Sequence, residues 1–127
     1  AYWSSLFKTR RPADFTTARA RLSAQLAEPG RMAALRAMMA ADVSVSEARL
    51  PAVTTPAVVV MGTRDPDFPD PAAEARLIAG RLRGEVVLID GAGHYPQAEY
   101  PAETAAAILA PSTGPGHASD GVSTIAG

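Results

Sequence analysis

Two short polar segments carry the side chains best suited to chemistry. Asp65 lies in residues 63–70, which are rich in Asp and Pro, and His94 lies in residues 90–96, which are rich in Gly. A carboxylate that accepts a hydrogen bond from an imidazole Nδ1–H fixes the tautomer of the ring, so that Nε2 faces the substrate as a general base. If the two residues are neighbours in space, they have the chemistry of an acid that orients a base.

Each polar segment follows a short apolar run that is rich in β-branched residues. Residues 57–61 (AVVVM) precede the first segment and residues 86–89 (VVLI) precede the second. Such runs are typical of strands buried on both faces of a parallel sheet. The intervening residues predict a helix with Asp70 at its N-cap, Pro71 in its first turn and Gly84 at its end. Loops at the carboxyl ends of neighbouring parallel strands meet at one edge, so we expect Asp65 and His94 to come within hydrogen-bond reach.

The remaining sequence divides around this βαβ unit. Residues 1–50 read as helical, with one helix beginning at Asp14 as N-cap and ending before Pro29, and another over residues 31–41. A last helix begins with Pro101. Residues 111–127 are rich in Pro, Gly and Ser, which predicts a disordered tail. The sequence thus predicts an α/β fold with two parallel strands in residues 51–110, preceded by a helical segment.

Composition excludes several classes of function. The 127 residues contain no Cys, which excludes disulfide scaffolds, thiolate metal sites and cysteine nucleophiles. Twelve basic residues face 13 acidic ones, so we expect neither nucleic acid nor a membrane as a partner. The longest apolar run is far below the roughly 20 residues of a membrane span, and the start resembles no signal peptide. We expect a cytoplasmic protein, and a first residue of Ala suggests a start within a longer protein.

The order of these elements resembles the C-terminal part of an α/β-hydrolase. The resemblance covers residues 51–110 and lies in the pattern strand-GTRDPDFP, helix, strand-DGAGHYP and closing helix. By this resemblance Asp65 corresponds to the acid of a Ser-His-Asp triad and His94 to its base. Residues 1–50 stand where the family inserts a cap or lid over the active site. The resemblance implies a hydrolase that needs no cofactor and acts on an ester or a similar small apolar substrate.

The family's nucleophile motif is missing from this sequence. No G-x-S-x-G occurs in the 127 residues, and the nearest string, residues 121–125, lies after the histidine instead of before the acid. We therefore expect the N-terminal half of the same protein to supply the nucleophile, and we expect this chain by itself to be inactive. An aspartate nucleophile, as in dehalogenases and epoxide hydrolases, stays open.

Other interpretations compete with the triad. Asp67 fits an exposed turn or a secondary contact, and Asp70 fits the N-cap. Asp65 and Asp67 after an apolar strand also resemble the paired carboxylates of Mg²⁺-dependent phosphoryl transfer, although a Gly-Thr-Arg segment separates them from the strand. A hydrolase-like binding protein without a nucleophile is a further alternative. The aromatic residues Tyr2, Trp3 and Phe7 fit either a substrate pocket or buried packing.

Overall fold

The computed structural model describes residues 2–110 and 122–126. The chain divides into two compact units, one of Ala1–Arg11 with Leu50–Gly127 and the other of Pro12–Arg49. The first residues of the chain, including helix α1 (Tyr2–Ser5), therefore group with the α/β part and not with the helical segment in which the sequence placed them. Among the described helices, none has the length and apolar character needed to cross a membrane.

The unit Pro12–Arg49 is helical, as the sequence predicts. It contains α2 (Phe15–Ala27), α3 (Arg31–Met39) and α4 (Ser44–Arg49). Asp14 stands at the N-cap position of α2, but its side chain makes no capping hydrogen bond, so its expected capping role is wrong. The function of this unit as a cap stays a prediction.

The other unit is built on a three-stranded parallel sheet with the order β1-β2-β3. The two expected strands are present as β1 (Val58–Gly62) and β2 (Glu85–Ile89), and Gly62 pairs with Ile89 at their carboxyl ends. A short 3-10 helix, η1 (Leu50–Ala52), precedes β1. Helix α5 (Pro71–Leu82) connects the strands, which confirms the predicted βαβ unit.

The third strand corrects the expectation of a disordered tail over residues 111–127. Strand β3 (Val122–Ile125) pairs with the edge of β2 that β1 leaves open, and Asp90 N–H donates to the Ile125 carbonyl at 3.0 Å. An unpaired strand edge offers a row of backbone donors and acceptors that an extended segment satisfies. Val122 packs against the core on one face of the sheet and Ile125 against the core on the other. Residues 111–121 and 127 lie outside the described part.

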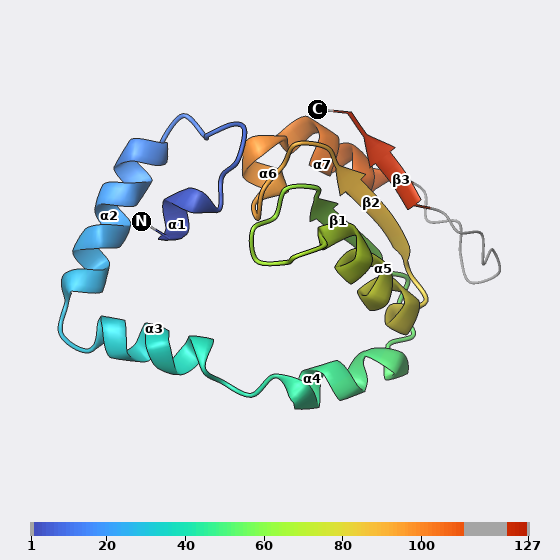
Figure 1. Cartoon of the computed structure of the whole chain (residues 1–127), viewed down its shortest axis with the longest axis horizontal. Helices are drawn as coiled ribbons and strands as arrows, with labels where there is room; N and C mark the ends of the chain where they lie inside the picture. The colour runs from blue at the N-terminus through green and yellow to red at the C-terminus, as the bar shows by residue number, and fades with distance from the viewer. Residues whose placement is uncertain (1, 111–121, 127) are drawn as a thin grey trace. The chain divides into compact units, whose positions relative to one another are not determined.

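Helices cover both faces of the sheet (Figure 1). Helix α5 packs on one face, and α6 (Pro96–Glu99) and α7 (Pro101–Leu109) lie on the other. Because successive strand residues point to opposite faces, the core is split into two clusters. The α5 cluster contains Met61, Ala75, Ala79, Val86 and Leu88, and the opposite cluster contains Val87, Ile89, Ala92, Tyr100 and Ala107.

The two ends of α5 are fixed in different ways. Asp70 caps the start as predicted, because its Oδ1 accepts from the Ala73 N–H at 2.9 Å. At the other end Arg83, and not Gly84, takes the left-handed conformation, with φ of 53°. Gly84 is required for a different reason, since a Cβ there would lie 2.6 Å from the Ala57 carbonyl oxygen.

Candidate active site

The loops after β1 and β2 are bound to each other at the carboxyl edge of the sheet. Thr63 N–H donates to the Ile89 carbonyl at 3.1 Å, and Arg64 N–H donates to the Ala92 carbonyl at 2.9 Å. The Thr63 hydroxyl also accepts from Gly91 N–H at 2.9 Å. These bonds fix the height of each loop above the sheet, and so the positions of the Asp65 and His94 side chains that follow.

Gly62, the last residue of β1, lies very close to the loop that carries His94. A Cβ at this position would collide with the carbonyl oxygens of Ala92 and Gly93 and would lie 2.7 Å from the Ala92 carbonyl carbon. These are backbone atoms, which cannot move aside without shifting the loop that carries His94. The absence of a side chain at Gly62 is therefore a geometric condition for bringing the two loops together.

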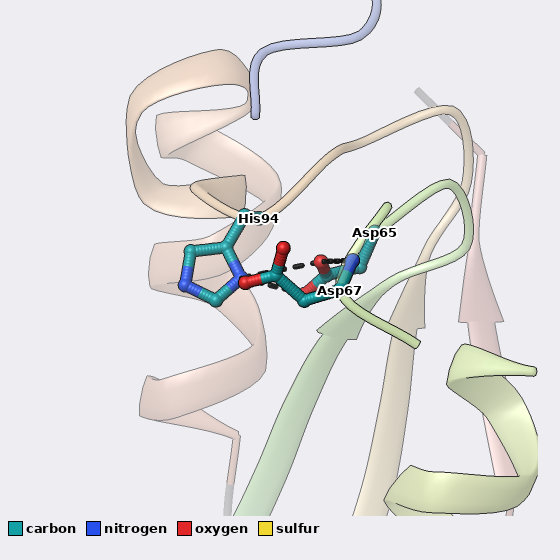
Figure 2. A group of neighbouring side chains, drawn as sticks. All are labelled: Asp65, Asp67 and His94. Carbon is teal, nitrogen blue, oxygen red and sulfur yellow. Dashed lines mark hydrogen bonds and ion pairs between the residues drawn. The ribbon is translucent and has the colours of Figure 1, made fainter. Parts of the chain in front are cut away.

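Asp65 and His94 meet above this contact, as the sequence predicts (Figure 2). His94 Nδ1 lies 2.9 Å from Asp65 Oδ2 and 3.2 Å from Oδ1. An ionised carboxylate only accepts hydrogen bonds, so Nδ1 carries the hydrogen when this bond forms. The other ring nitrogen lies on the side of the imidazole that faces away from the carboxylate. The Asp65 side chain is 4% exposed and that of His94 is 35% exposed, which places a buried acid behind an accessible base.

Asp67 adds a second carboxylate beside the ring. Its Oδ2 lies 3.5 Å from His94 Nδ1, and its backbone N–H donates to Asp65 Oδ1 at 3.0 Å. Its Oδ1 accepts a hydrogen bond from the hydroxyl of Tyr2 at 2.6 Å. This bond raises the pKa of Tyr2 above its ordinary range, with smaller contributions from desolvation and from the nearby negative charges. Asp67 is thus both an exposed turn residue and a secondary contact of His94, the two interpretations that the sequence left open.

Glu99 is the residue of this region that sequence reasoning missed. It is 2% exposed, and its carboxylate accepts backbone hydrogen bonds from Gly93 and from residues 8–10. Next to it, His94 N–H donates to the Leu6 carbonyl at 2.9 Å. One feature of the sequence could have pointed to Glu99: it is the single acidic residue in the otherwise uncharged segment from Tyr95 to Tyr100, and it lies five residues after His94.

A row of aromatic rings leads from α1 to His94. Trp3 lies 5.1 Å from Phe7, Phe7 lies 5.1 Å from Tyr95, and Tyr95 lies 5.1 Å from the imidazole, all as distances between ring centres. Phe7 is buried. The aromatic residues Trp3 and Phe7 near the N-terminus are therefore linked to the surroundings of His94.

The same groups also form a candidate cation site. In the part of the chain that the structure describes, Asp65, Asp67 and His94 are the one group of three metal-ligating side chains, with ligand atoms within 4.8 Å of one another. A cation bound through His94 Nδ1 would need the lone pair of the atom that faces Asp65 at 2.9 Å. Coordination through this nitrogen would therefore replace its hydrogen bond to Asp65.

A known protein family matches the part of the chain that contains these elements. The family model described as "Alpha/beta hydrolase family" matches residues 1–107. The chain belongs to the alpha/beta hydrolase family. Neither the curated proteins nor the solved structures gave a match to the chain. The family match extends N-terminally beyond the βαβ unit that carried the resemblance, and includes both Asp65 and His94.

Proposed function

We propose that Asp65 and His94 are the acid and base of a hydrolytic triad that acts on a carboxylic ester or a similar small apolar substrate. The observation that carries the proposal is the hydrogen bond between a buried carboxylate and Nδ1 of an accessible imidazole, at the carboxyl edge of a parallel sheet. The family match supports the hydrolase assignment. The row of aromatic rings beside His94 supports an apolar substrate.

The arrangement assigns each group a step. Asp65 holds the ring with Nδ1 protonated, so that Nε2 removes the proton from a serine hydroxyl as the oxygen attacks the ester carbonyl. The buried carboxylate stabilises the imidazolium that forms. His94 then passes the proton to the leaving alcohol, and the same cycle with water releases the acid product. Backbone N–H groups near the nucleophile would stabilise the oxyanion.

The proposal assigns the nucleophile to a further part of the same protein, its N-terminal half. The support is the absence of any G-x-S-x-G motif from the 127 residues. The serine of residues 121–125 does not replace it. Ser123 belongs to β3, whereas a serine nucleophile of this type occupies a sharp turn between a strand and a helix.

Labelling of the intact protein with a fluorophosphonate, followed by peptide mapping, tests this assignment. We expect a labelled serine outside residues 1–127. Replacing His94 with Ala should reduce ester turnover by at least roughly 10³-fold, and Asp65→Asn should have an effect of similar order. Asp70→Asn is the matched control, because it removes a carboxylate from the same loop and keeps a good N-cap.

The possible outcomes separate the alternatives. Near-normal turnover by the His94→Ala variant would contradict the proposal. Turnover of alkyl halides or epoxides without fluorophosphonate labelling would indicate an aspartate nucleophile. A protein that binds apolar ligands and turns over none of these substrates would be a binding protein, and a phosphatase activity that requires Mg²⁺ would assign the carboxylates to metal binding.

A further inference from the structure

The carboxylate of Glu99 joins two backbone segments that are far apart in the sequence. Its Oε2 accepts from the N–H groups of Lys8, Thr9 and Arg10 at 2.9, 2.8 and 3.1 Å. Its Oε1 accepts from Gly93 N–H at 2.6 Å. A buried carboxylate is unfavourable unless hydrogen bonds replace its hydration, and here four backbone donors do so. Both oxygens are used, so the side chain holds the two segments together.

The residue after this contact is His94. Gly93 is bound to Glu99, and the next N–H along the chain, that of His94, donates to the Leu6 carbonyl at 2.9 Å. A Cβ on Gly93 would collide with the Leu6 carbonyl oxygen and lie 2.9 Å from Glu99 Oε1. Thr9 adds a third connection, since its hydroxyl donates to the Gly91 carbonyl at 2.6 Å. The backbone of the histidine loop is therefore fixed at Gly91, at Gly93 and at His94 itself.

This anchoring is important because the His94 side chain is not enclosed. About a third of it is exposed, so packing alone does not hold the ring against Asp65. The orientation of an accessible ring then depends on where its backbone is held. Catalytic geometry tolerates displacements of only about 0.5 Å, which makes the supporting contacts important.

We propose that Glu99 is a positioning residue, which holds residues 8–10 against Gly93 and so keeps His94 Nδ1 on Asp65. The inference builds on the proposed function, because it gives the buried carboxylate a role at the same site. The inference also gives residues 6–10, near the N-terminus, a role in holding the backbone of His94 in place. The hydrogen bonds of Glu99 go to backbone N–H groups and not to Asp65 or the imidazole, so it acts through the backbone of the histidine loop.

Glu99→Gln tests the proposal with little change in shape. The amide keeps one accepting oxygen and presents an N–H₂ group in place of the other, so either Gly93 or residues 8–10 lose their acceptor. The matched control is Glu103→Gln on α7. It removes an acid whose Oε1 lies 3.6 Å from the side chain of Arg10, and leaves the backbone contacts of Glu99 intact.

The readout is the nitrogen-15 NMR spectrum of the His94 imidazole in the intact protein, assigned by difference from His94→Ala. In Glu99→Gln we expect the population with Nδ1–H bound to Asp65 to fall, with exchange of the Nδ1 proton about tenfold faster, since a charge-assisted hydrogen bond is lost. Glu103→Gln should give the spectrum of the unmodified protein. A folded Glu99→Gln variant with an unchanged His94 spectrum would overturn the proposal.

A second measurement applies if Glu99→Gln does not fold. In the unmodified protein, we expect the amide hydrogens of Thr9 and Gly93 and the His94 Nδ1 proton to exchange in one concerted opening. An Nδ1 proton that exchanges freely while both amides stay protected would overturn the proposal. Neither readout depends on turnover. A protein that gives the expected spectra but hydrolyses no ester would contradict the proposed hydrolase function and leave the positioning role of Glu99 intact.

Discussion

Replacing Gly62 with Ala tests whether the two site loops depend on a missing side chain. The added Cβ would lie 2.7 Å from the Ala92 carbonyl carbon, whereas ordinary contacts begin at 3.4 Å, so the histidine loop must retreat by at least about 0.7 Å. A retreat along the line to Asp65 would lengthen the 2.9 Å bond of His94 to roughly 3.6 Å, beyond hydrogen-bond range. Overpacking of this kind costs about 1–3 kcal/mol.

Gly80→Ala is the matched control for this substitution. Gly80 is exposed within α5, and a Cβ there meets nothing within 4 Å. Ala in a helix interior is favoured over Gly by about 0.5–1 kcal/mol, so this variant should unfold at a higher temperature. Thermal unfolding and the His94 NMR spectrum are the assays. If Gly62→Ala unfolds at the temperature of the unmodified protein and keeps the His94–Asp65 bond, the account of the loop contact is refuted.

Two further predictions concern single hydrogen bonds. The pKa of Tyr2 should lie above the ordinary tyrosine value of about 10, because its hydroxyl donates a hydrogen bond to Asp67. This bond stabilises the fold below pH about 10. The stabilisation is lost as the pH rises through the raised pKa of Tyr2. Ultraviolet titration of the protein against Tyr2→Phe measures the shift, and Asp67→Asn should reduce it. Asp70→Ala should lower the free energy of unfolding by about 1 kcal/mol, whereas Asp14→Ala, which removes no capping bond, should change it by a few tenths. Equal effects in chemical denaturation would contradict the assignment of the two caps.

The sequence was sufficient to predict the βαβ unit and the meeting of Asp65 with His94. Apolar runs of β-branched residues identify buried strands, and the parallel connection places both loops at one edge of the sheet. The strands are inferred from the local pattern of apolar residues, and the meeting of the loops is inferred from the rule for parallel connections. Both can be applied to a single sequence. The N-cap at Asp70 was predictable for the same reason, since a capping bond spans only three residues.

Features that depend on distant partners were not predictable in this way. Strand β3 is a four-residue segment whose pairing requires the open edge of β2, more than 30 residues earlier. Glu99 is interpretable only once residues 8–10 are known to lie against it, about 90 positions away in the chain. Gly84 was predicted from a helix-ending rule, but the structure shows that it is required by a close approach to Ala57.

The position of the hydrogen on the His94 imidazole in solution tests most directly the central claim that Asp65 orients His94. Nitrogen-15 NMR of the neutral imidazole in the intact protein distinguishes the ring nitrogen that carries the hydrogen. We predict that Nδ1 is protonated and Nε2 is bare, that the Nδ1 proton is protected from exchange, and that Asp65→Asn abolishes this state while Asp70→Asn preserves it. A neutral His94 with its hydrogen on Nε2, unaffected by Asp65→Asn, would contradict the pairing of acid and base on which the proposed hydrolase chemistry depends.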